Sequence, residues 1–81
     1  MFYVYIIKSL IEKYKYKGLT NNVERRFKEH NEGKNKTTRP YKPFELIHTK
    51  EFNTRKEART YEKFLKSSEG RELIKTTIDN I

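Results

Sequence analysis

The chain has 81 residues, contains no cysteine and carries a formal net charge of +8 at pH 7. This length predicts one small domain spanning 1–81, and the absence of cysteine excludes disulfides and thiolate metal sites. No apolar stretch approaches the length of a membrane span, so we expect an intracellular, soluble protein. The excess of cations favours a polyanionic partner such as nucleic acid.

The first segments of the chain have the patterns of two strands. Phe2–Ser9 is rich in aromatic and β-branched residues and is apolar on both faces, which predicts a central strand covered on both sides. In Tyr14–Leu19, Tyr14 and Tyr16 share one face and lysines share the other, as is typical of an edge strand. The short connection between the two segments predicts an antiparallel hairpin.

A helix is predicted to follow this hairpin. Asn21 or Asn22 can cap its N-terminus, and the apolar spacing continues to about Asn31. Gly33 is in a suitable position to end the helix in the left-handed conformation. A basic, turn-rich loop over 34–39 comes next.

The third predicted strand is Phe44–Thr49, in which we expect Leu46 to lie on the same face as Phe44, opposite Ile47. With the helices on either side of it in the sequence, the order of elements is β-β-α-β-α-α. This order predicts an α+β fold, in which helices flank a small, mainly antiparallel sheet of three strands.

The second helix is predicted to begin at a capping box formed by Thr54 and Glu57. Its apolar face is formed by Ala58, Tyr61, Phe64 and Leu65. We expect a break over 67–70, then a short helix anchored by Leu73 and Ile74, and frayed chain from Thr76 onward.

Three polar side chains lie at the borders of the predicted helix cores. His30 and Arg26 lie within or beside the apolar arc of the first helix, and Glu62 lies beside that of the second. Polar groups in such positions are either paired or face a cleft. From helical spacing alone, structural roles are favoured. Arg26 would pair with Glu29, Glu62 would pair with Lys66, and His30 would bond a backbone carbonyl.

Four segments in order carry a more specific signal: Tyr3-Val4-Tyr5, Tyr16-Lys17-Gly18, 19–31 and 54–66. Together, over about 2–75, the chain closely resembles the GIY-YIG nuclease family. It is most similar to the small single-domain bacterial members related to the nuclease domain of the UvrC excision-repair subunit. Tyr3 replaces the first motif glycine and Lys17 replaces an apolar residue of the second motif, but neither position carries the chemistry.

The resemblance implies roles for residues of the hairpin and the first helix. Tyr5 and Tyr16 correspond to the motif tyrosines, one of which orients or deprotonates the attacking water, and Gly18 corresponds to the motif glycine. Arg26 corresponds to the arginine that stabilises charge on the phosphate. His30 matches a histidine that acts as a base or contacts the phosphate.

The second helix would complete the site, because Glu62 corresponds to the carboxylate that holds one divalent ion, Mg²⁺ or Mn²⁺. The resemblance thus implies a metal-dependent endonuclease that hydrolyses DNA and leaves a 5′-phosphate and a 3′-hydroxyl, in repair or recombination. We expect basic residues to bind the DNA backbone without reading bases. These residues are Lys34, Lys36, Arg39, Lys42, Arg55, Lys56 and Arg59.

Two other functions remain open from the sequence. One is a catalytically silent nucleic-acid-binding module on the same fold. The other is a basic RNA-binding protein that uses its tyrosines as stacking platforms. Exposed aromatic faces would favour RNA binding, whereas tyrosines bonded around Glu62 and Arg26 would favour the nuclease. The natural substrate is not specified, and a protein partner could supply specificity.

Overall fold

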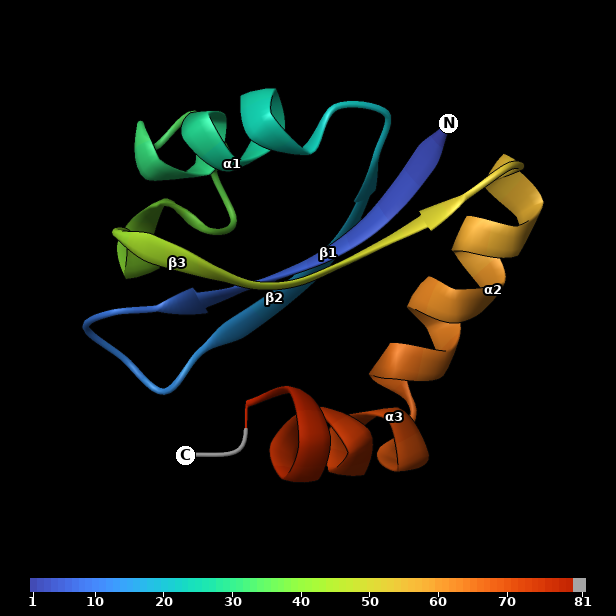
Figure 1. Cartoon of the computed structure of the whole chain (residues 1–81). Coiled ribbons are helices and arrows are strands. Elements are labelled where there is room, and N and C mark those ends of the chain that lie inside the picture. Colours follow the sequence, from blue (N-terminus) through green and yellow to red (C-terminus); the bar gives the residue numbers. More distant parts are fainter. Residues whose placement is uncertain (80–81) are drawn as a thin grey trace.

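The computed structural model describes residues 1–79, and its elements follow the predicted order (Figure 1). The strands are β1 (Phe2–Ser9), β2 (Lys15–Thr20) and β3 (Phe44–Phe52), which is longer than predicted. The helices are α1 (Val23–Asn31), α2 (Arg55–Lys66) and α3 (Ser68–Leu73), with a 3₁₀ turn at Arg39–Tyr41 and a π-helical turn at Ile74–Ile78. The strands pair antiparallel in the order β2-β1-β3, which confirms the α+β fold.

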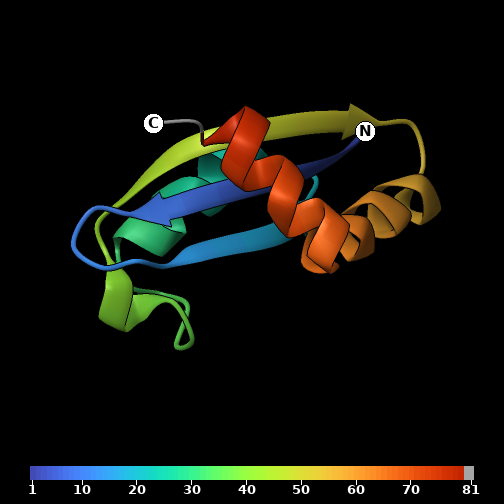
Figure 2. The ribbon, with the colours of Figure 1, turned by 90° about the horizontal axis from the view of Figure 1, so that it is seen from below.

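Strand β1 lies in the centre of the sheet, and its side chains divide the core into two parts. Val4 and Ile6 are fully buried on the face covered by α2 and α3, whereas Tyr5 and Ile7 are buried on the face covered by α1. Figures 1 and 2 show α1 on one side of the sheet and α3 on the other. Both faces of this strand are therefore apolar because, as predicted, helices cover the sheet on both sides.

Strand β3 contains a bulge. Its pairing with β1 skips Ile47, since Ile6 lies opposite His48 and Ile7 lies opposite Leu46. Ile47 packs against the core on the α2 side, while Leu46 on the α1 side is 39% exposed. The predicted faces are confirmed, since Leu46 lies on the side of Phe44 and Ile47 lies on the other side. The extra residue reverses the alternation only beyond Ile47, so that His48 faces the α2 side with Ile6.

Helix α1 is anchored at both ends. The side chain of Asn22 caps it by accepting the N–H of Arg25 at 3.0 Å, and Gly33 ends it with a φ of 78°. Near its C-terminus, the Asn31 side-chain oxygen accepts the N–H of Phe44 at 2.6 Å and so ties the helix to β3. These bonds fix the height and rotation of α1 above the sheet.

Helices α2 and α3 meet at a tight junction. Thr54 caps α2 as predicted, since its hydroxyl accepts the N–H of Glu57 at 3.2 Å, and the same hydroxyl donates to the Glu57 carboxylate at 3.0 Å. The predicted break over 67–70 was wrong beyond its first residue, because Ser67 alone separates the helices and caps α3 through the N–H of Gly70. Gly70 is buried, and a Cβ there would collide with the carbonyl of Phe64, so glycine permits this close packing.

The predicted fraying from Thr76 was also wrong for the described residues, while 80–81 lie outside them. The π-helical turn packs Ile78 against the core. The Asp79 carboxylate then bonds Lys8 of β1 at 3.1 Å and Lys15 of β2 at 3.2 Å. Within residues 1–79, the helices are too short and too polar to cross a membrane.

Candidate active site

A buried hydrogen bond joins the centre of the sheet to α1. Tyr5 is 1% exposed, and its hydroxyl oxygen lies 2.8 Å from Nε2 of His30, which is completely buried. Gly18 lies opposite Tyr5 in β2, and the Tyr5 hydroxyl occupies the space that a Cβ at this position would fill. The motif glycine therefore makes room for the phenol of the motif tyrosine.

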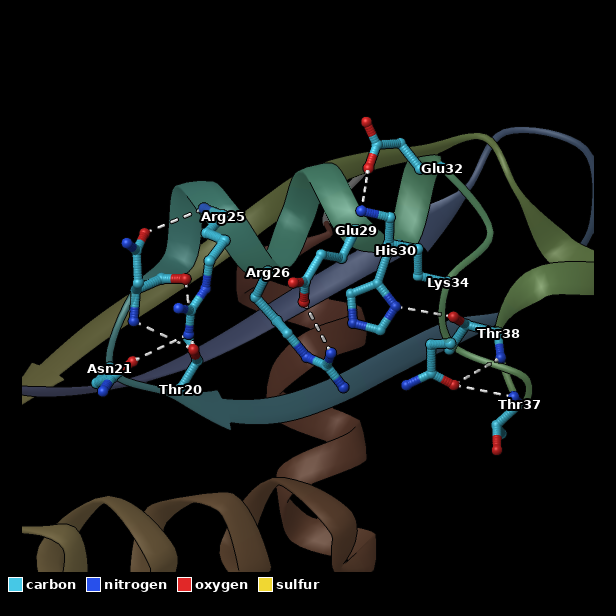
Figure 3. A network of polar contacts seen from close by, with 12 residues as sticks. Thr20, Asn21, Arg25, Arg26, Glu29, His30, Glu32, Lys34, Thr37 and Thr38 are labelled. Atoms are coloured by element: carbon cyan, nitrogen blue, oxygen red, sulfur yellow. Dashed lines mark hydrogen bonds and ion pairs between the residues drawn. The ribbon is translucent and has the colours of Figure 1, made fainter.

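The His30 ring is oriented by a second hydroxyl group. Its Nδ1 lies 2.8 Å from Oγ1 of Thr38, a fully buried residue in the loop after α1 (Figure 3). The predicted bond from His30 to a backbone carbonyl was thus wrong, because a folded loop supplies a side-chain partner. Nothing in the loop sequence distinguished Thr38 from the neighbouring Thr37, and its role was missed.

Burial has opposite effects on the two bonded groups. It raises the pKa of Tyr5 to about 12, with a further contribution from Tyr16, although the Arg26 guanidinium opposes this shift. It lowers the pKa of His30, and the positive charge of Arg26 adds to this decrease. Both Tyr5 and His30 are therefore uncharged at neutral pH.

Arg26 is the cation of this group. It projects from α1 toward β2 in Figure 3, and its terminal nitrogen Nη1 lies 3.0 Å from Oε1 of Glu29. The predicted pair is present, and about a third of each side chain is exposed. A guanidinium has five N–H donors in a planar fork, so an ion pair through one nitrogen leaves donors for a phosphate.

Tyr16 and Glu62 approach the same centre from β2 and α2. The Tyr16 ring centroid lies 5.1 Å from that of His30 and 6.3 Å from that of Tyr5. Glu62 forms the predicted pair with Lys66 at 3.5 Å, and its side chain is 16% exposed. Its negative charge is the smallest of the contributions to the raised pKa of Tyr5.

The acidic groups of the site offer little to a metal ion. Among residues 1–79, no three side chains of the His, Cys, Asp or Glu type are grouped so that they could hold one. Glu62 by itself suits only an ion that keeps most of its water ligands and shares a phosphate oxygen, as Mg²⁺ does. The donor set is thus compatible with one hydrated hard cation.

The seven basic residues predicted to bind DNA fall into two exposed groups. The first group surrounds the loop after α1, where Arg39 donates to the Gly33 carbonyl at 2.8 Å and Lys34 pairs with Glu32 at 3.3 Å. The second group lies in the first turns of α2. Their contact with DNA stays a prediction.

Each of the six tyrosines is buried or half-buried. Tyr5 is buried, and Tyr14 stacks on Tyr41 with ring centroids 3.9 Å apart. A base cannot stack on the buried ring of Tyr5, nor on the faces that Tyr14 and Tyr41 cover for each other. The packing of these tyrosines favours a bonded site over a stacking platform for single-stranded RNA.

Comparisons with known proteins identify the family of the chain. The family model of the GIY-YIG catalytic domain matches residues 1–75. UPF0213 proteins of Natronomonas pharaonis and Haloquadratum walsbyi are 42% and 44% identical to the chain over 66 residues. These matches cover 80% of this chain and 76% and 73% of those proteins, respectively.

A solved structure supports the same relationship. The NMR structure of a UPF0213 protein from Bacillus halodurans has a TM-score of 0.55 and 37% identity to the chain. The match covers 91% of this chain and 82% of that one. The bonded group around Tyr5 and His30 lies wholly within the matched residues. The chain therefore belongs to the GIY-YIG catalytic domain family, a family of nucleases.

Proposed function

We propose that this protein is a divalent-metal-dependent endonuclease that hydrolyses phosphodiester bonds in DNA. The observation that carries the proposal is the buried 2.8 Å hydrogen bond between Tyr5 and His30, with Arg26 beside it. Hydrolysis of a phosphodiester needs an acceptor for the proton of the attacking water and cations that stabilise the charge on the phosphate. The group contains candidates for both tasks.

The proposed proton path runs through both buried groups. The Tyr5 oxygen accepts a proton from the attacking water while its own proton passes to Nε2 of His30. This requires the imidazole tautomer whose Nδ1–H donates to Thr38. Because burial raises the pKa of Tyr5 to about 12, transfer through the phenol avoids a tyrosinate as a separate species.

The remaining steps concern the phosphate. As the water oxygen bonds to phosphorus, the bond to the 3′ oxygen breaks. The 3′ oxygen leaves with the bonding electron pair and takes a proton from solvent. The Arg26 guanidinium binds the nonbridging oxygens as their negative charge grows. Glu62 would hold the Mg²⁺ or Mn²⁺ ion, which supplies Lewis-acid stabilisation of the phosphoryl oxygens when bound.

The experiment is a plasmid-nicking assay with Mg²⁺ or Mn²⁺, in which each site variant has a matched control. The pairs are Arg26→Gln with Arg25→Gln, Glu62→Gln with Glu72→Gln, and Tyr5→Phe with Tyr3→Phe. Losing a charge-stabilising group should slow cutting by about 10²–10³-fold, while each control keeps wild-type activity. Branched and damaged duplexes test the proposed setting in repair or recombination.

Equal cutting by a site variant and its control would contradict the role of that residue. If the wild-type protein binds DNA but cuts none of the substrates with either ion, the protein is a binding module on a nuclease fold. Cleavage of RNA alone would retain the chemistry and correct the substrate.

A further inference from the structure

The face of the sheet opposite Tyr5 has a hollow of about 680 Å³ between the β1–β2 hairpin and α3. In Figure 2, α3 and the turn after it lie across this hairpin. Cations dominate the lining, although Glu12 also contributes. The cations that matter here are Lys8, Lys15, Lys17, Arg71 and Lys75. None of the basic residues predicted from the sequence to bind DNA belongs to this lining.

The cations of the hollow are crowded. Lys17 is half-buried, and its pKa is lowered by burial and by the positive charges of Arg71, Lys66 and Lys15. Like charges held together in a partly dry site repel one another and favour an anion between them. The cations come from the β1–β2 hairpin, from α3 and from the turn after it, and these elements converge on one concave surface.

A carboxylate of the chain already binds in the hollow. The two oxygens of Asp79 contact Lys8 at 3.1 Å and Lys15 at 3.2 Å, and its side chain is 8% exposed. Burial would raise the pKa of Asp79, but the hydrogen bonds and charges of Lys8 and Lys15 outweigh this effect and lower it. The hollow thus accommodates an anion with two charge-assisted bonds.

The hollow and the candidate active site meet at the free edge of β2. Tyr16 and Gly18 face Tyr5, whereas Lys17 between them lines the hollow. Strand β2 is an edge strand, so its outer side is not paired with another strand.

We propose that the hollow binds a backbone phosphate of the nucleic-acid substrate. This phosphate would lie next to the one at the bond that is cut, with strand β2 between the two. Asp79 is the internal competitor that holds Lys8 and Lys15 until this phosphate displaces it. The inference rests on the proposed function for its nucleic-acid substrate, but it concerns binding and is tested without cleavage.

The test measures binding of a labelled DNA duplex by fluorescence anisotropy over a series of salt concentrations, with the full chain carrying Glu62→Gln. The pocket variant is Lys17→Gln with Arg71→Gln, and its charge-matched control is Lys28→Gln with Lys63→Gln. Loss of one phosphate contact should reduce the slope of log K against log salt by about one. The control should keep the slope of its parent.

Asp79→Asn tests the competitor, because it frees Lys8 and Lys15 for the phosphate. It should increase DNA affinity and steepen the salt slope, whereas an Asp79 that only fastens α3 would leave both unchanged. The conservative variant Lys17→Arg with Arg71→Lys keeps the charges and should bind as its parent does. Thermal unfolding of every variant separates loss of binding from loss of folding.

Inorganic phosphate distinguishes a free anion from a nucleic-acid phosphate. The proposal is supported if phosphate raises the melting temperature of the parent but not of the pocket variant, and if the pocket variant also has the smaller salt slope in DNA binding. Equal salt slopes for the pocket and control variants overturn it, even if free phosphate binds. If the wild-type protein cuts DNA but the pocket and control variants have equal salt slopes, only this inference is refuted. If the wild-type protein does not cut DNA but the two slopes differ, only the proposed catalysis is refuted.

Discussion

The hydroxyl group of Tyr5 lies directly against Gly18, in the space where any other residue at position 18 would place its Cβ atom. Gly18→Ala must therefore displace the Tyr5 ring and its bond to His30. An error of about 1 Å in such a group can cost about 10²-fold in rate. We expect this loss in the plasmid-nicking assay, together with destabilisation of about 1–3 kcal/mol from overpacking.

Gly70→Ala is the control for overpacking, because it also forces a Cβ against buried atoms, at the α2–α3 junction. It should destabilise the protein by a comparable amount but retain cutting at temperatures where it is folded. If both variants lose activity equally at matched folded fractions, the contact between Tyr5 and Gly18 has no special role in catalysis.

Thr38→Val removes the hydroxyl that holds Nδ1 of His30 and keeps nearly the same shape. The buried nitrogen then lacks a partner, which should cost about 1–3 kcal/mol in the free energy of unfolding. Chemical denaturation measures this cost, and nicking should slow because the ring loses its fixed tautomer. The neighbouring Thr37 is exposed, so Thr37→Val should change neither quantity.

Stability should fall as the pH decreases below the ordinary histidine value of about 6.5. Burial, aided by Arg26, lowers the pKa of His30 in the folded state, so the unfolded chain takes up its proton first. The contribution is complete above that pH and is lost as the pH falls toward the depressed folded value. His48 shifts in the same direction, through burial and Lys50.

Melting temperatures measured across this range for the wild type, His30→Gln and His48→Gln separate the two histidines. Each variant should have a flatter pH profile than the wild type, since each removes one buried neutral imidazole. An unchanged profile for His30→Gln would show that its protonation is not linked to folding.

The chain order of elements and the shared faces of the hairpin could be predicted because they depend on local periodicity. The same holds for the Asn22 cap, the Gly33 terminator and the ion pair between Arg26 and Glu29, whose partners lie within one helical turn. Tyr5 and His30 were assigned to one site through the family resemblance. Helical spacing alone favoured a structural His30.

Features that depend on long-range packing could not be predicted. The bond from Thr38 to His30 requires the path of a loop, and the anchoring of Asp79 by Lys8 and Lys15 joins residues at opposite ends of the chain. Lys15 was expected on the polar face of an edge strand. That face is polar, but α3 encloses it to form the hollow.

Leu46 and Ile47 in β3 give the last prediction, because these neighbouring apolar residues lie on opposite faces of the sheet and differ in burial. Ile47 packs against the core on the α2 side, whereas Leu46 on the α1 side is 39% exposed. Ile47→Ala should therefore destabilise the protein by about 1–3 kcal/mol, below the upper range for fully buried residues because Ile47 is only partly buried. Leu46→Ala should cost no more than about 0.5 kcal/mol, as at other surface positions. Urea denaturation of both variants compares the two costs directly, and a larger loss for Leu46→Ala would contradict the burial assigned to the two side chains.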